Sequence, residues 1–77
     1  MSVHIGKEIK KKVEERKKTV VGLSRELGCH RTNVYRIFES PTVDSGILSR
    51  LSVILDYDFF SLYSEDIRSK INQNREK

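Results

Sequence analysis

Apolar residues recur at helical spacing along almost the whole chain. Ile5, Ile9 and Val13 follow one another every fourth residue, with lysines and glutamates between them. This spacing places the apolar side chains on one face of a helix and the charged ones on the other. The pattern predicts a first amphipathic helix over about Val3–Arg16, with its lysines facing outward.

Two short helices are predicted next, separated by a glycine. Thr19 is a suitable N-cap for a helix over Val20–Leu27, and Gly28 can adopt the left-handed conformation that ends a helix without a steric penalty. A further helix is expected over about Arg31–Phe38. Pro41 prevents it from continuing.

The second half of the chain has the same helical character. A fourth helix, capped by Thr42 or Asp44, is predicted from a stripe of apolar residues, namely Ile47, Leu48, Leu51, Ile54 and Leu55. An aromatic run then precedes a short C-terminal helix that would begin after Ser64. Because no segment alternates in the manner of a strand, the expected fold is all-α, with four or five helices.

Length and composition indicate one small soluble domain. The chain has 77 residues and a single cysteine, so it cannot form an internal disulfide. Secreted domains of this size usually depend on such bridges. The N-terminal residues lack the apolar run of a signal peptide, and no stretch has transmembrane length. We therefore expect a cytoplasmic protein with no membrane association.

Positive charge is concentrated near the N-terminus. The formal net charge is +4, and residues 1–18 alone carry seven lysines and arginines against three glutamates. An excess of this size permits binding to a polyanion but does not require it, because many basic surfaces are only solvated faces.

The segment from Leu23 to Ser40 combines two amphipathic helices with polar, donor-rich side chains. Two helices joined by about four residues that include a glycine are typical of a helix-turn-helix unit. Leu23 and Leu27 would pack inward, and Ser24 is small enough to let the next helix cross closely. At about 100° per residue, the direction opposite the inner face of the later helix falls between Thr32 and Arg36. Arginine, asparagine and threonine are suited to the base edges of the DNA major groove.

This unit resembles the helix-turn-helix of the Cro/repressor-type (Xre) family of small phage and bacterial transcriptional regulators. The resemblance rests on a leucine, a small residue, a glycine and two branched apolar residues at the family's offsets, supplied here by Leu23, Ser24, Gly28, Val34 and Ile37. It implies a lambda-repressor-like DNA-binding domain of four or five helices over residues 1–63, followed by a C-terminal tail over residues 64–77.

The resemblance also implies roles for individual residues. The positions that read bases in the family are occupied here by Arg31, Thr32, Asn33 and Arg36. The first residue of the second helix, which often reaches a phosphate in the family, is Val20 and cannot do so. Phosphate contacts are therefore expected from nearby side chains, namely Thr19, Lys17, Lys18 and Tyr35. The expected partner is double-stranded DNA, bound by a homodimer that forms either in solution or only on the DNA.

Other functions are considered beside this one. No nucleophile–base set, phosphate-binding glycine loop or carboxylate pair is present, so we expect neither an enzyme nor a cofactor. Cys29, His30 and His4 do not have the spacing of a structural zinc site, so no metal is expected. An antitoxin-like module that binds a protein partner through residues 59–77 is the first alternative. A nonspecific nucleic-acid binder, using the lysines of residues 7–18, is the second.

Overall fold

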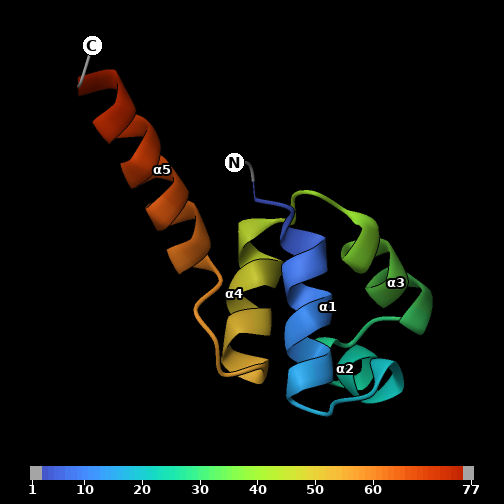
Figure 1. The fold of residues 1–77 in the computed structure, drawn as a ribbon. Helices are drawn as coiled ribbons and strands as arrows, with labels where there is room; N and C mark the ends of the chain where they lie inside the picture. Colours follow the sequence, from blue (N-terminus) through green and yellow to red (C-terminus); the bar gives the residue numbers. More distant parts are fainter. Residues whose placement is uncertain (1–2, 76–77) are drawn as a thin grey trace.

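The computed structural model describes residues 3–75, which form five α-helices and no strand. Their bounds are α1 (Ile5–Glu15), α2 (Val20–Leu27), α3 (Arg31–Glu39), α4 (Ser45–Ile54) and α5 (Phe60–Arg75). The expected all-α class is confirmed. Helix α1 lies at the centre, with α3 on one side, α4 on the other and α2 beneath, while α5 extends away from this bundle (Figure 1).

The core is formed by the apolar faces that the periodicity predicted. Its ten buried hydrophobic residues are Ile5, Ile9, Val13, Leu23, Leu27, Val34, Leu48, Leu51, Leu55 and Phe59. They come from the first four helices and the segment just before α5, so these parts of the chain share one core. Burial of this apolar surface is the main favourable term in folding.

Side chains cap the N-termini of the first four helices. Thr19 Oγ1 accepts from the Gly22 N–H at 3.0 Å, as the sequence predicted for α2. At α4 the cap is Asp44, and Thr42 is not used. His4 and His30 cap α1 and α3 through Nδ1. Histidine is not among the favoured N-cap residues, and its use at α3 was not expected.

Three helices end in the left-handed conformation. At the end of α2, Gly28 has φ 71°, and the Cys29 N–H reaches back to the carbonyl of Ser24 at 2.9 Å. Lys17 after α1 and Asp56 after α4 adopt the same conformation, with φ 56° and 51°. A Cβ atom makes this conformation unfavourable, so only the α2 terminus has the residue best suited to it.

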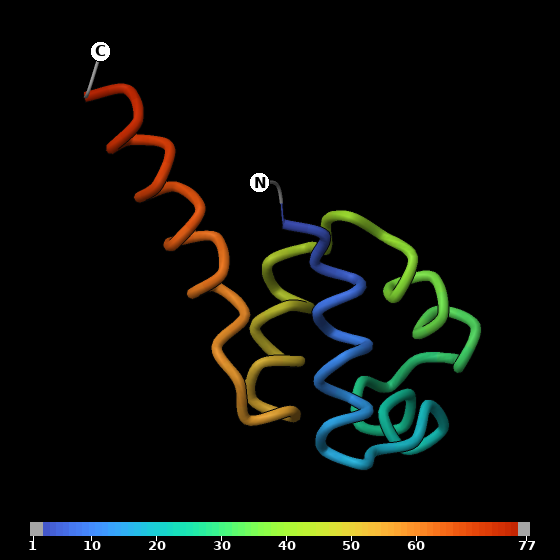
Figure 2. The backbone as a smooth tube through the Cα atoms, viewed as in Figure 1, coloured from blue at the N-terminus to red at the C-terminus, as the bar shows by residue number. Residues whose placement is uncertain are grey.

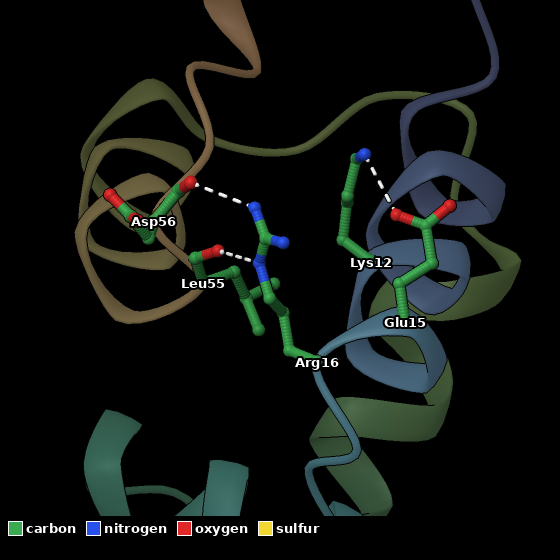
Figure 3. A network of polar contacts seen from close by, with 5 residues as sticks. All are labelled: Lys12, Glu15, Arg16, Leu55 and Asp56. Carbon is green, nitrogen blue, oxygen red and sulfur yellow. Dashed lines mark hydrogen bonds and ion pairs between the residues drawn. The ribbon is translucent and has the colours of Figure 1, made fainter.

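Two arginines bind the carbonyl ends of helices to which they are not adjacent in sequence. Arg16 Nε donates to the carbonyl of Leu55 at 2.9 Å, and its Nη2 donates to that of Asp56 at 3.1 Å (Figure 3). Arg50 Nη2 donates to the carbonyl of Leu27 at 3.1 Å. A cation at a helix C-terminus also interacts favourably with the helix dipole. These arginines therefore tie α1 to α4 and α4 to α2.

The network in Figure 3 also contains an ion pair on α1. Lys12 Nζ lies 2.8 Å from Glu15 Oε2, and this hydrogen bond is the main reason that the pKa of Glu15 is lowered. The same ammonium group lies 4.2 Å from the centre of the Tyr57 ring, which belongs to the segment between α4 and α5. Lys12 therefore forms an ion pair within α1 and also contacts the segment between α4 and α5.

Gly6 allows α1 to approach the end of α3 closely. The Gly6 N–H donates to the carbonyl of Ser40 at 2.9 Å, and the Ile5 N–H donates to that of Pro41 at 3.1 Å. A Cβ atom on Gly6 would lie 2.5 Å from the carbonyl oxygens of Phe38 and Ser40. The absence of a side chain at this position therefore determines how closely the end of α3 packs against α1.

The C-terminal helix begins earlier than the sequence indicated. It was expected after Ser64, but α5 starts at Phe60, where Asp58 Oδ1 accepts from the Phe60 N–H at 3.0 Å. None of the residues of α5 is buried, and the helix leaves the bundle in Figure 2. The resulting extents are 48 × 20 × 20 Å. Residues 76 and 77 of the expected tail lie outside the described residues.

Within residues 3–75, no helix combines the length and apolar character needed to cross a membrane.

Candidate nucleic-acid interface

Helices α2 and α3 are packed together by the residues that the sequence assigned to this role. Leu23, Leu27 and Val34 are buried, and Ile37 is half-buried. Ser24 is 6% exposed, and its hydroxyl donates to the carbonyl of Val21 at 2.7 Å, which satisfies the buried oxygen. The small side chain can therefore lie in the core without an unpaired polar group.

The four residues predicted to contact bases lie on the exposed side of α3. Arg31, Thr32, Asn33 and Arg36 are all exposed, whereas Val34 has no exposed surface. Helix α3 lies on the side of α1 away from α4 and α5, so the projecting C-terminal helix does not cover it (Figure 1). The chain therefore presents this group of side chains to solvent on one helix.

The two arginines of α3 have no intramolecular partner among the described residues. The ion pairs within residues 3–75 join Lys12 with Glu15, Lys18 with Glu26 and Lys70 with Asp66, and no hydrogen bond in this range uses the guanidinium group of Arg31 or Arg36; the backbone carbonyl of Arg36 accepts from the Ser40 hydroxyl at 2.7 Å. Each guanidinium group carries five N–H donors. Both groups are thus available to an external acceptor.

Thr32 is less available than the arginines. Its hydroxyl lies 2.9 Å from His30 Nδ1, and the same ring nitrogen accepts from the Thr32 N–H at 3.2 Å. Both contacts belong to the cap of α3. The Thr32 hydroxyl therefore has a local hydrogen bond to exchange before it can bind a ligand, although its methyl group can still make apolar contacts.

The residues predicted to contact phosphates have different surroundings. Lys17 is exposed, while Lys18 Nζ lies 3.5 Å from Glu26 Oε1. Thr19 accepts the capping bond of α2, but its hydroxyl proton remains available to donate. Tyr35 is 53% exposed and packs edge-on against Phe38 with ring centres 6.4 Å apart.

An open groove brings two of these residues together. It runs between α1 and α3, and its lining mixes apolar, basic and acidic side chains, including Val13, Phe38, Lys7, Lys10, Lys18, Tyr35, Glu14 and Glu39. Lys18 and Tyr35 come from different segments of the chain, yet they border the same depression. Two side chains able to donate to an anion therefore lie on the α1 side of α3.

Several residues that position the helices of the bundle were not identified from the sequence. Gly6 had a detectable signal, because a glycine inside a helical pattern often marks a close approach of two backbones. His30 caps α3 through Nδ1, although histidine is not a favoured N-cap residue. Arg16 and Arg50 bind carbonyls 39 and 23 residues away in sequence, a pairing that no local pattern contains.

No known family model matches the chain, and neither a curated protein nor a solved structure matches it.

Proposed function

We propose that this chain is a sequence-specific DNA-binding transcriptional regulator, in which α2 and α3 form a helix-turn-helix and α3 enters the major groove. The observation that carries the proposal is the exposed set Arg31, Asn33 and Arg36 on one helix, with neither arginine paired inside residues 3–75. Helix α3 is anchored to the core, and its two arginine side chains have no partner within residues 3–75. Such side chains are suited to binding an external anionic partner.

The chemistry of these side chains matches base edges better than a general anion. Arginine can bind guanine O6 and N7 through two parallel hydrogen bonds, and asparagine can do the same with adenine N6 and N7. A major groove about 12 Å wide admits one helix. Arg31 and Arg36 are about 7.5 Å apart along the axis of α3, given a rise of 1.5 Å per residue. We therefore assign base reading to α3, with Thr32 adding apolar contact.

Phosphate contacts would fix the orientation of α3. Lys17, Lys18, Thr19 and Tyr35 come from the start of α2 and from the flank of α3, where the DNA backbone would pass. Contacts of this kind hold the register of the protein but carry no sequence information. Because Lys18 already has Glu26 beside it, Lys17 is expected to contribute more.

A single copy offers few base contacts, so useful specificity requires two half-sites. Homodimeric proteins of this kind bind half-sites about 34 Å apart, one turn of DNA. We propose that this protein binds its operator as a homodimer in the cytoplasm.

A second candidate function is favoured by α5. This helix extends from the bundle and exposes Ile67 and Ile71 by 54% and 45%. An antitoxin-like module would use such a helix to hold a protein partner, with DNA binding incidental. This function predicts that DNA binding does not depend on Arg31 or Arg36.

The experiment is a selection from a random duplex library. The wild-type chain should enrich one motif, and Arg31→Ala/Arg36→Ala should lose the enrichment. Lys10→Ala/Lys11→Ala is the matched control, because it removes two exposed positive charges from α1 instead. It should retain the motif. Failure of the wild type to enrich any sequence, or equal losses in both double variants, would refute the proposal.

A further inference from the structure

A small cavity lies between the end of α2, helix α3 and the first turns of α4. Its volume is about 290 Å³, and the residues that line it are Leu27, Cys29, Asn33, Ile37, Ile47 and Arg50. These residues come from three helices and the turn after α2, so the cavity exists only in the folded chain. The volume equals that of about ten water molecules at roughly 30 Å³ each, which suits a ligand of about ten non-hydrogen atoms.

Apolar side chains form most of the wall of this cavity. Leu27 is buried, Ile37 is half-buried and Ile47 is 37% exposed. The half-buried thiol of Cys29 adds a weakly polar surface. Sites for small molecules commonly combine such a wall with a few polar groups that fix the orientation of the ligand.

The charge in the cavity is of one sign. Arg50 is the one charged residue in the lining, and no carboxylate faces it there. The ion pairs within residues 3–75 do not include Arg50. By contrast, the groove between α1 and α3 mixes its lysines with Glu14 and Glu39. The cavity beside Arg50 therefore complements a single negative charge.

Arg50 is held in place through one of its nitrogen atoms. Its Nη2 donates to the carbonyl of Leu27 at 3.1 Å and to that of Glu26 at 3.4 Å. A guanidinium group has five N–H donors, and within the described residues no hydrogen bond uses Nε or Nη1 of Arg50. The donors on these two atoms are therefore free to bind an anion.

The start of α3 adds to the attraction for an anion. Cys29 and Asn33 flank the N-terminus of this nine-residue helix, and a helix dipole is positive at that end. The side-chain amide of Asn33 can donate two N–H bonds. The carbonyls at the negative end of α2 are already bound by Arg50. An anion in the cavity therefore meets donors from both α3 and α4.

We propose that this cavity binds a small monocarboxylate with a compact apolar body, such as an aryl-substituted or branched alkyl carboxylate. The carboxylate binds Arg50 and Asn33. The apolar body contacts Leu27, Ile37 and Ile47. A carboxylate is assigned rather than a phosphate monoester, because one arginine balances one charge and a phosphate monoester carries nearly two at neutral pH.

Asn33 links the cavity to the candidate interface. It is among the side chains proposed to read bases, so a carboxylate that binds its amide withdraws the amide from adenine. A bound monocarboxylate should therefore weaken DNA binding. This consequence rests on the proposed function, whereas the site itself does not.

An NMR titration of the isotopically labelled chain with 3-phenylpropionate or 4-methylpentanoate, in the absence of DNA, tests the site. The largest shifts are expected over residues 27–33 and 47–50, with a dissociation constant of about 1 mM or lower for ligands of this size. 3-Phenylpropanamide lacks the charge and should bind at least about tenfold more weakly than the acid. Acetate lacks the apolar body and should cause no saturable shift. The absence of saturable shifts with both carboxylates, or equal binding of the acid and its amide, would overturn the proposal.

Two variants test the assigned residues in the same titration. Asn33→Asp brings a carboxylate into the cavity and leaves the bonds from Arg50 to the α2 carbonyls, so it should weaken binding by about tenfold or more. Arg50→Gln removes the charge of the cavity and should abolish saturable binding. Arg25→Gln is the matched control, because Arg25 is exposed on α2 and does not line the cavity. Thermal melts would show that the variants keep the fold, and a folded Asn33→Asp chain that binds like the wild type would contradict the proposal.

A competition experiment separates the site from its consequence for DNA. In fluorescence anisotropy on a selected duplex, 3-phenylpropionate at about ten times its dissociation constant should weaken DNA binding by up to about tenfold. Binding of 3-phenylpropionate without any change in DNA affinity would overturn the regulatory consequence. A chain that binds 3-phenylpropionate but selects no duplex would refute the proposed function and still support the site.

Discussion

Replacing Gly6 with alanine should disturb the contact between α1 and α3. The added Cβ would lie 2.5 Å from the carbonyl oxygens of Phe38 and Ser40, and the carbonyl of Ile37 is also too close. Ordinary contacts of a Cβ begin near 3.4 Å. The end of α3 must therefore retreat by about 1 Å, and backbone atoms cannot move aside as the tip of a flexible side chain can.

The expected cost has two parts. Overpacking of this kind costs about 1–3 kcal/mol. The retreat also weakens the 2.9 Å hydrogen bond from the Gly6 N–H to the Ser40 carbonyl, which contributes about 1 kcal/mol. We therefore expect Gly6→Ala to lower the free energy of unfolding by about 3 kcal/mol. For a domain of this size, that is a fall in Tm of about 12–24 °C.

The assay is thermal and urea unfolding followed by circular dichroism at the helical band. Gly46→Ala is the matched control, because Gly46 is the second residue of α4, as Gly6 is the second residue of α1. Its Cβ would meet only the Asp44 carboxylate, at 3.0 Å, and the change in stability should stay within about 0.5 kcal/mol. A Gly6→Ala chain with the same Tm as the wild type would refute the close packing of α1 against the end of α3.

Three further predictions concern the candidate interface and its support. Arg36→Ala should cost about 1–3 kcal/mol on the selected site and flatten base preference there, measured by fluorescence anisotropy on the site and its variants; an unchanged preference would contradict base reading. Lys17→Gly should raise the free energy of unfolding by about 1 kcal/mol, because Lys17 has φ 56°, a conformation that glycine adopts without a steric penalty. The same variant should weaken binding to all duplexes alike and lower by about one the slope of the logarithm of the binding constant against the logarithm of the salt concentration. A loss of stability, or an unchanged slope, would count against this prediction. Ser24→Leu should destabilise the domain by about 1–3 kcal/mol in urea unfolding, because Ser24 is buried on the inner side of α2 and a larger side chain would overpack the core. Ser69→Leu is its control, since Ser69 is exposed on α5, and it should leave the stability nearly unchanged.

Local signals account for the parts of the fold that the sequence predicted well. The bounds Val20–Leu27 were predicted to the residue, because Thr19 and Gly28 mark the two ends of that helix by their side-chain and backbone chemistry. The buried faces followed from spacing alone. The exposure of Arg31 and Arg36 follows from the same periodicity, since the inward direction of α3 was defined by Val34.

The parts that were missed depend on contacts between distant segments or on unusual caps. Arg16 binds the end of α4, a contact that exists only after the chain has folded. The early start of α5 did have a local signal, because Asp58 precedes the aromatic run and accepts from the Phe60 N–H. The involvement of Thr32 in the cap of α3 required the position of the His30 ring. Sequence periodicity determines which face is exposed but not which exposed groups already have partners.

We propose that the exposed face of α3 is the surface that binds DNA. An NMR titration of the isotopically labelled chain with a duplex tests it most directly, because each backbone amide reports on its own surroundings. We expect the largest shifts over residues 31–36 and at the start of α2, with residues 65–75 unaffected. Shifts confined to the lysine-rich face of α1 or to α5, with α3 unchanged, would contradict it.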